Sequence, residues 1–254
     1  MSENSPTWDD HADWWQREFT DGVDPEYVEQ IIPLALEYLE GSHRIIDIGT
    51  GEGQIARAAA TLGADVLGVD PTAALIELAM ERAGGPEYLV AGAEALPVDD
   101  ESVDAAIICL VLEHIDDPEP VMSEISRVLR PGGRLVLFLN HPLLQTPGSA
   151  LIVDHMVEPV ETYWRLGPYL PGGASVEEVQ RDVFVRFVHR PLSEYVNGLT
   201  DAGLQIVHME EPSPPPGFLD KAGVNERDLV AATPRLLLLV AEKREFPAAS
   251  IGVQ

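Results

Sequence analysis

The sequence predicts an α/β protein in which helices cover both faces of a parallel sheet. Three observations support this fold class. Short apolar segments alternate with helical segments from residue 44 to residue 139. Residues 103–110 form a run that is apolar apart from Asp104, typical of a strand buried on both faces. A glycine-rich turn joins the first expected strand to the first helix of the alternating region.

The expected elements follow from these patterns in chain order. Asp24-Pro25 is typical of a helix start, and this helix runs towards Leu39, with Pro33 either kinking it or beginning a second helix. A turn is expected at Pro131-Gly132-Gly133. The expected strands are 44–48, 65–69, 87–90, 103–110, 134–139, 204–209 and 236–242, and the later helices are 54–62, 72–83, 118–129 and 191–202.

The alternation divides the chain into five parts. Residues 1–40 are expected to form a helical lid, 41–140 the core, and 191–245 the C-terminal part of the core, followed by a tail at 246–254. Residues 141–190 are too long for a plain connection, so we expect a functional cap with weak helical pieces and a strand near 183–188. The proline-rich segment 211–216 is expected to be a loop.

The net charge of the chain restricts the partners it can bind. The chain has 16 basic and 43 acidic residues and a net charge of −27. Such a surface repels phosphate backbones, so no nucleic-acid partner is expected. Only Lys221 and Lys243 are lysines, which indicates either an arginine-biased genome or adaptation to a salty cytoplasm. Equal stability in low and molar salt would exclude the second interpretation.

Other features concern location and metal binding. No apolar run reaches membrane-spanning length, and residues 1–15 lack the basic and apolar regions of a signal peptide. We therefore expect a cytoplasmic protein without a membrane partner. The single cysteine, Cys109, excludes an internal disulfide and a cysteine-based zinc site, and its apolar surroundings predict a buried structural thiol. No metal is expected.

The glycine-rich turn has the sequence Asp47-Ile48-Gly49-Thr50-Gly51-Glu52-Gly53. Glycines permit a sharp turn and close approach of a ligand, although such turns also contain glycine for steric reasons alone. The dinucleotide pattern requires glycine at position 54, where this chain has Gln54. Glu52 would also repel a pyrophosphate. The turn therefore favours a ligand that carries an ammonium and a sulfonium and lacks phosphates.

Asp70 is the second element of the predicted site. It follows the second expected strand, where a carboxylate can accept hydrogen bonds from both hydroxyls of a ribose. It can also cap the helix that follows Pro71. The two roles are compatible because the side chain has two oxygens.

These segments together resemble a known family. Five stretches within residues 44–141 are similar to motifs of class I S-adenosylmethionine-dependent methyltransferases. They are IIDIGTGEGQIA, VLGVDPT, GAEALPV, SVDAAIICLVLEHIDDP and EISRVLRPGGRLVLFLNHP. The similarity is greatest to the small-molecule group related to ubiquinone and menaquinone methyltransferases. It implies a Rossmann-like, doubly wound, seven-stranded sheet of order 3-2-1-4-5-7-6, with LLLLVAEK as the antiparallel seventh strand.

The resemblance also implies roles for individual residues. The cofactor would be S-adenosylmethionine, and the product S-adenosylhomocysteine. Asp47 would face its ammonium group, Asp70 its ribose, and the Ala93-Glu94 pair its adenine, while Cys109 and Leu110 would lie beside the sulfonium. The remaining cofactor contacts implied are Gly49, Thr50, Gly51, Gly53, Pro71 and Trp15. Relatives usually have aspartate where this chain has Gly92, so we expect weaker adenine recognition.

The acceptor side of the site is less defined by sequence. Methyl transfer to a phenol or amine needs a proton acceptor, and the candidates are His141 first, then His114 and His189. Each could instead be a hydrogen-bonded structural histidine. Aromatic residues of the cap, Tyr163, Trp164 and Phe187, together with His141 and Trp14, are expected to contact the substrate; for the cap aromatics the alternative is a small satellite core.

The sequence leaves several functions open. The first hypothesis is O- or N-methylation of a small aromatic or secondary-metabolite acceptor by a monomer or homodimer, with C-methylation of a quinone-like substrate also allowed. The second is a non-catalytic protein that binds the cofactor. The third is an NAD-dependent oxidoreductase, which Gln54 and Glu52 disfavour.

Overall fold

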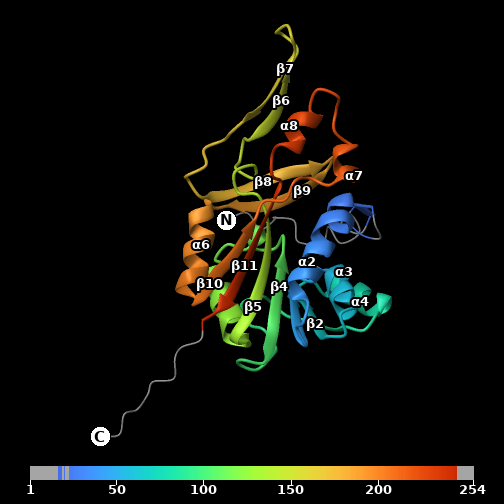
Figure 1. The fold of residues 1–254 in the computed structure, drawn as a ribbon, viewed down its shortest axis with the longest axis vertical. Helices are drawn as coiled ribbons and strands as arrows, with labels where there is room; N and C mark the ends of the chain where they lie inside the picture. The colour runs from blue at the N-terminus through green and yellow to red at the C-terminus, as the bar shows by residue number, and fades with distance from the viewer. Residues whose placement is uncertain (1–16, 19, 21–22, 245–254) are drawn as a thin grey trace, which may run out of the picture.

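The structure is a computed structural model that describes residues 17–18, 20 and 23–244 (Figure 1). A seven-stranded sheet forms the body of the molecule. Its strand order is β3, β2, β1, β4, β5, β11, β10, so the predicted order 3-2-1-4-5-7-6 is confirmed, with β11 as the seventh strand. The strands from β3 to β5 are parallel, and β11 runs antiparallel to both of its neighbours. The protein therefore has the Rossmann-like α/β fold that the sequence predicts.

The strands of this sheet lie close to their predicted positions. Their bounds are β1 Arg44–Ile48, β2 Asp65–Asp70, β3 Glu87–Val90, β4 Val103–Cys109, β5 Leu129–Asn140, β10 Leu204–Glu210 and β11 Leu236–Lys243. The largest difference is in β5, whose irregular first residues include the expected turn at 131–133. Its pairing with β4 shifts register there, and Gly132 has a φ of +74°. All seven residues of β4 are buried, as expected for a central strand.

Helices cover both faces of the sheet, each over its own core cluster. On one face α3 (Gln54–Ala60) and α4 (Ala73–Arg82) pack with the N-terminal helices over Ile45, Ile107 and Phe138. On the other face α5 (Glu119–Val128) and α6 (Leu192–Asp201) pack over Ile46, Ile108 and Leu137. Alternate residues of one strand point to opposite faces, so the same strands supply both cores.

The N-terminal helix changes its winding next to Pro33. A π-helical turn, η1 (Tyr27–Ile31), runs directly into α2 (Ile32–Leu39), which has Pro33 in its first turn. Pro33 lacks an N–H, so a regular α-helical ladder cannot continue through it. Asp24 Oδ1 accepts a hydrogen bond from Glu26 N at 2.9 Å, which confirms the predicted start of the helix.

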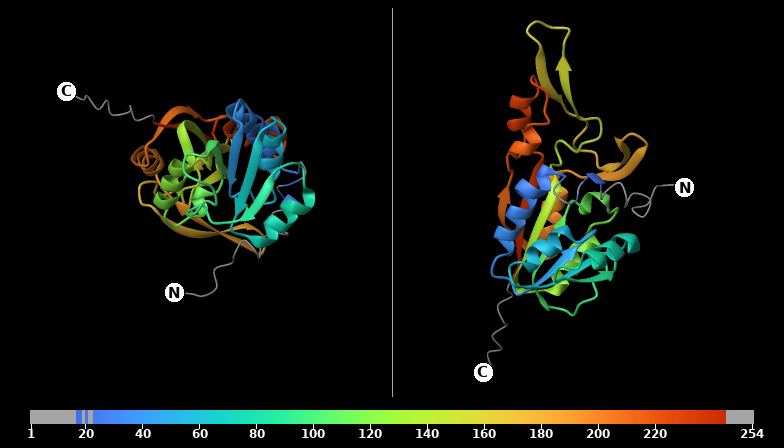
Figure 2. Two further views of the ribbon diagram at one scale, coloured as in Figure 1. Left: turned by 90° about the horizontal axis from the view of Figure 1, so that it is seen from below. Right: turned by 90° about the vertical axis from the view of Figure 1, so that its right-hand side faces the viewer.

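The cap segment 141–190 forms two β-hairpins, so the expectation of weak helical pieces there was wrong. One hairpin pairs β6 (Ala150–Asp154) with β7 (Glu161–Arg165) and projects from the body beside α8 (Figure 1). The other pairs β8 (Gly173–Gln180) with β9 (Val183–His189), which confirms the predicted strand, and the two hairpins diverge (Figure 2).

Two short helices in the C-terminal part were not predicted. α7 (Pro216–Leu219) begins at the last residue of the expected loop, and α8 (Arg227–Ala231) follows it. The neighbouring segments bond to the first hairpin, because Thr162 donates to Asn225 O at 2.7 Å and Trp164 donates to Thr233 Oγ1 at 3.0 Å. In the described part of the chain, no helix has the length and apolar character needed to cross a bilayer.

Asp104 joins the ends of two central strands. Its Oδ2 accepts hydrogen bonds from the backbone N–H groups of His43 at 2.7 Å and Arg44 at 3.0 Å, and Oδ1 is paired with Arg130 at 2.6 Å. The Asp104→Ala change leaves two donors without their acceptor, so we expect a loss of about 2 kcal/mol in the free energy of unfolding, measured with urea. Asp104→Asn keeps an acceptor oxygen and should lose clearly less. Equal losses would contradict this account.

Candidate functional site

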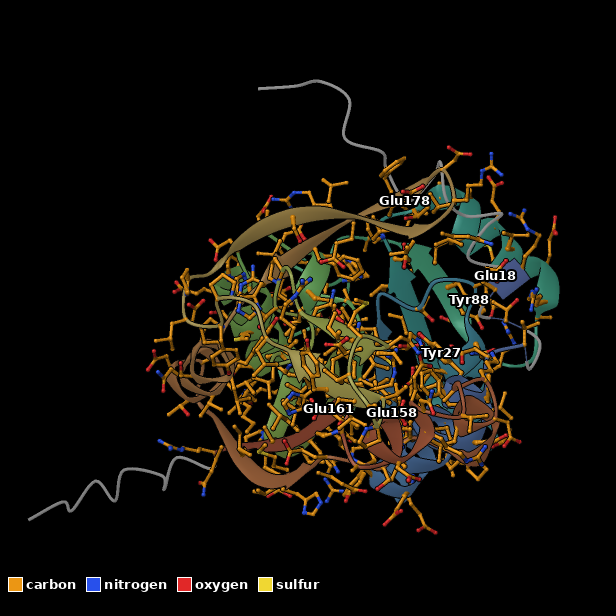
Figure 3. All side chains as sticks on the ribbon, turned by 90° about the horizontal axis from the view of Figure 1, so that it is seen from above. Glu18, Tyr27, Tyr88, Glu158, Glu161 and Glu178 are labelled. Atoms are coloured by element: carbon orange, nitrogen blue, oxygen red, sulfur yellow. The ribbon has the colours of Figure 1, made fainter. Side chains whose placement is uncertain are left out.

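A pocket of about 350 Å³ opens at the carboxyl ends of the parallel strands. The loops after β1, β2, β3 and β4 line it, and η1 contributes Tyr27. Figure 3 shows the molecule from the cap side, with Tyr27 and Tyr88 beside the first strands and Glu161 and Glu178 on the two hairpins. Ligands of doubly wound sheets bind at this edge, so this pocket is the candidate site.

The glycine-rich turn after β1 forms one wall. Gly49, Gly51 and Gly53 have φ values of +72°, +56° and +84°, a conformation that favours glycine. A Cβ at Gly49 would overlap Val111, and one at Gly53 would overlap the phenol of Tyr88. Gly49 and Gly51 line the pocket, whereas Gly53 lies behind it as the N-cap of α3. The glycines are therefore required by the packing of the protein as well as by any ligand.

Asp47 is a carboxylate in the floor of the pocket. Its side chain accepts a hydrogen bond from Thr50 Oγ1 at 2.7 Å, and the residue is 1% exposed. Burial raises the pKa of Asp47 to about 7, although the hydrogen bond from Thr50 opposes the shift. A cation bound beside Asp47 would favour its charged form.

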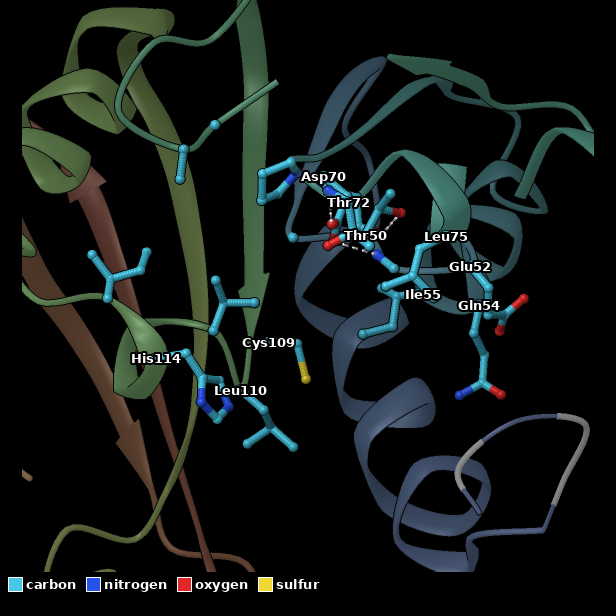
Figure 4. A pocket seen from close by; sticks show the side chains of 18 of the residues that line it. Thr50, Glu52, Gln54, Ile55, Asp70, Thr72, Leu75, Cys109, Leu110 and His114 are labelled. Carbon is cyan, nitrogen blue, oxygen red and sulfur yellow. Dashed lines mark hydrogen bonds between the residues drawn. The ribbon is translucent and has the colours of Figure 1, made fainter. Parts of the chain in front are cut away.

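Asp70 connects the end of β2 to the glycine-rich turn. Its Oδ2 accepts a hydrogen bond from Gly51 N at 3.0 Å, and its Oδ1 accepts one from Thr72 N at 2.8 Å (Figure 4). The second bond is the capping role considered from the sequence. Each carboxylate oxygen can accept a further hydrogen bond, so Asp70, which lines the pocket, can also bind a diol.

The loop after β3 brings Gly92, Ala93 and Glu94 to the pocket. A Cβ at Gly92 would lie 2.5 Å from Glu94 Oε1. Gly92 therefore makes room for the Glu94 carboxylate in its observed position. An aspartate at position 92 would force Glu94 to move.

Glu52 corrects one argument made from the sequence. Its carboxylate is buried and paired with Arg57 at 2.6 Å and Arg82 at 3.2 Å. Because two arginines compensate this charge, repulsion by Glu52 is not a sound reason to exclude a pyrophosphate. The missing glycine at Gln54 remains the sequence argument against a dinucleotide.

The opposite wall comes from the end of β4 and the turn after it. The residues on this side are Cys109, Leu110, Val111, His114 and Ile115. Of these, Cys109, Leu110 and His114 lie across the pocket from Asp70 and Thr50 (Figure 4). Burial raises the pKa of the Cys109 thiol well above its usual value, which supports the structural role predicted for it. Burial also raises the pKa of Tyr27 well above its usual value. The sequence did not predict Tyr27 as a pocket residue, because it lies on a helix far from the motifs.

His114 lies in the pocket wall with its ring orientation fixed. Its Nδ1 is 2.9 Å from Arg186 O, and its ring lies 4.9 Å from that of Phe187. A carbonyl oxygen only accepts hydrogen bonds, so Nδ1 carries the proton and Nε2 is the acceptor atom of the neutral ring. Phe187, a predicted substrate residue, thus supports the pocket through His114.

The other two candidate histidines lie outside the pocket. His141 accepts a hydrogen bond from Leu143 N at 3.2 Å and its Nε2 is 2.7 Å from Glu211 Oε1. His189 Nε2 is 2.7 Å from Tyr169 O. Both rings are buried and engaged by the protein, so the structure does not support them as proton acceptors, nor His141 as a substrate contact.

The remaining predicted residues divide into two groups. Tyr163 and Trp164 lie on β7 of the projecting hairpin and do not line the pocket; Trp164 instead bonds to Thr233. Their contact with a substrate stays a prediction. Trp14 and Trp15 lie outside the described residues.

Comparison with known proteins agrees with this geometry. Residues 46–137 match a family model described as a methyltransferase domain. The structure resembles that of an S-adenosylmethionine-dependent methyltransferase from Mesorhizobium loti, at 25% identity and a TM-score of 0.69 over 86% of this chain and 98% of that one. Residues 46–137 are thus similar to a methyltransferase domain, and the chain shares its fold with an S-adenosylmethionine-dependent methyltransferase.

Sequence relatives cover less of the chain. An uncharacterised methyltransferase of Mycobacterium tuberculosis is 34% identical over 46% of this chain and 45% of its own length. A demethylmenaquinone methyltransferase of Clavibacter sepedonicus is 37% identical over 37% and 40%. The chain thus spans about half the length of the curated relatives it matches. A putative methyltransferase of Haloferax volcanii, in complex with the activator Trm112, shares the fold at 19% identity, covering 94% of this chain and 98% of that one, with a TM-score of 0.61.

The raised pKa of Asp47 predicts pH-dependent cofactor binding. The ammonium group of S-adenosylhomocysteine favours the charged carboxylate, so binding releases a proton and affinity rises with pH. We expect affinity roughly tenfold lower at about pH 6 than at about pH 8, measured by calorimetry. Asp47→Asn should bind more weakly and lose this dependence. A variant that keeps the wild-type pH profile would assign the titration to a group other than Asp47.

Proposed function

We propose that this methyltransferase transfers a methyl group from S-adenosylmethionine to a hydroxyl or amine of a small, apolar acceptor without an anionic group. The observation that carries the proposal is the position of His114. Its imidazole lines the pocket opposite the glycine-rich turn and Asp70, with Nδ1 held by Arg186 O. A proton acceptor therefore faces the part of the pocket that fits the cofactor.

The residues of the pocket fit S-adenosylmethionine. Asp47 offers a buried carboxylate for its ammonium, Asp70 retains acceptor capacity for the ribose hydroxyls, and Leu75 and Ala93 offer apolar surface. When bound, the cofactor supplies a methyl group on a positively charged sulfur. Thr50, Pro71 and Leu110 are further lining residues that would contact it.

The protein contributes alignment and proton removal. Val111 and Ile115 form an apolar wall that can hold an acceptor beside His114 and exclude water. His114 Nε2 accepts the proton of the hydroxyl or amine as the new bond to carbon forms. The high pKa of Tyr27 makes its phenol a hydrogen-bond donor rather than a base.

The charge of the lining indicates the class of acceptor. Asp47, Glu52, Asp70 and Glu94 are acidic, and no lysine or arginine lines the pocket within the described residues. A carboxylate or phosphate on the acceptor would find no lysine or arginine among these lining residues, and Asp70 and Glu94 would repel it.

One observation favours a second candidate. The Clavibacter relative is named a demethylmenaquinone methyltransferase, which points to methylation of carbon on a quinol-like ring. The apolar wall and His114 also suit such an acceptor. Product analysis by mass spectrometry and NMR separates a new C–CH3 bond from an O- or N-methyl group.

The acceptor class can be tested with matched phenols. Para-ethylphenol, tyramine and para-hydroxyphenylacetate share a ring and differ in charge. We expect release of S-adenosylhomocysteine with the neutral or cationic compound and at least about tenfold less with the anion. Preference for the anion would contradict the proposed class. Cofactor binding without turnover on this and a wider set of neutral phenols, amines and quinols would favour a non-catalytic protein.

The role of His114 can be tested with the acceptor so found. His114→Ala should lower kcat about 10²–10⁴-fold while the affinity for S-adenosylmethionine stays within a few fold. His141→Ala is the matched control and should retain turnover, since His141 bonds to Glu211 outside the pocket. Loss of activity in the control with full activity in His114→Ala would restore His141 as the proton acceptor.

A further inference from the structure

Strand β9 is attached to the turn that carries His114. This turn comprises η2 (Leu112–His114) and the two residues that follow it. The strand and the turn are about seventy residues apart in sequence. Even so, Arg186 of β9 and Arg190, the residue after β9, form hydrogen bonds with the turn. The orientation of His114 therefore depends on a distant segment of the chain.

Arg190, directly after β9, makes the central contact. Its Nη1 donates to Leu112 O at 3.0 Å, and its Nη2 donates to the carbonyl oxygens of Ile115 and, at 2.8 Å, Asp116. The residue is 5% exposed. The planar guanidinium thus spans both ends of the turn, which a single ammonium group cannot do with the same geometry.

Two residues of β9 hold the ring and the end of the turn. Arg186 O accepts the Nδ1 proton of His114, while the Arg186 side chain is paired with Asp116. Phe187 packs against the imidazole. If Arg190 released the turn, His114 would move relative to Arg186 O and lose the bond that selects its tautomer.

We propose that Arg190 is a positioning residue for His114, acting by fixing the 112–116 turn against β9. This inference rests on the proposed function only in giving His114 a catalytic role. Arg190 does not line the pocket, so it acts through the turn and not on the substrate or cofactor. A merely structural arginine would affect stability without changing the state of the His114 ring.

The ring can be observed without an acceptor. The chain has seven histidines, and comparison with His114→Gln assigns the ring signals of His114 in nitrogen NMR spectra. At alkaline pH the wild type should show a protonated Nδ1 and an unprotonated Nε2. Arg190→Met should lose this single tautomer and give averaged ring shifts, and kcat should fall while the affinity for S-adenosylhomocysteine is retained. Arg190→Lys keeps the charge but lacks the planar guanidinium that bonds to both ends of the turn, so it should not restore the wild-type ring signals.

Arg127 provides the matched control. It donates to Val98 O at 3.0 Å and to Leu96 O at 3.2 Å, so it also holds a loop by its carbonyls, away from η2. Arg127→Met should lower the melting temperature and leave the His114 ring signals unchanged. If Arg190→Met does not fold, Arg190→Lys carries the test because it retains the buried stem and charge.

The outcomes are distinct. Wild-type His114 signals in a folded Arg190→Met or Arg190→Lys protein would overturn the positioning role. An equal change in Arg127→Met would also overturn it, since loss of stability alone would then explain the effect. If the Arg190 variants change the ring but His114→Ala keeps full turnover, the proposed function fails and the structural link between Arg190 and His114 stands.

Discussion

The site depends on Asp70, because this one carboxylate holds together two segments that neither strand could position alone. One oxygen binds Gly51 in the turn after β1, and the other binds Thr72 at the start of the next helix. Val69 O adds hydrogen bonds from Gly49 N and Thr50 N, which close the turn over the end of β2. With the turn fixed in this way, Asp47 faces the pocket from its floor. The cofactor side is thus built from backbone and buried carboxylates of adjacent parallel strands.

The acceptor side is built differently. Its wall is the turn after β4, and the contacts that orient His114 come from β9 in the cap. The two walls of the pocket are therefore built by separate parts of the chain: the loops after β1 and β2 form one wall, and the turn after β4, held by β9, forms the other. Leu110, at the boundary, has a φ of +56°, an uncommon conformation for a residue with a side chain, where the chain turns from β4 into this wall.

Sequence reasoning predicted the parts that local patterns encode. The alternation of apolar and polar residues and the positions of the glycines predicted the sheet strands, and the spacing from Gly49 to Asp70 predicted two segments that line one pocket. The acceptor side could not be predicted because His114, His141 and His189 look alike in sequence. Their roles depend on long-range partners, namely Arg186 O, Glu211 and Tyr169 O. The hairpins of the cap were missed for a related reason. β6 is short and half-buried despite its apolar residues 150–153, and β7 alternates exposed and half-buried residues, so the two strands depend on pairing with each other.

The central claim is that the pocket between Asp70 and His114 recognises S-adenosylmethionine and not a dinucleotide. Calorimetric titration with S-adenosylhomocysteine and, separately, with NAD tests it most directly. The account predicts one saturable site for S-adenosylhomocysteine, greatly weakened by Asp70→Ala in a protein that remains folded, and no heat of binding with NAD. Binding of NAD at the same site, or S-adenosylhomocysteine affinity that is unchanged in Asp70→Ala, would contradict it.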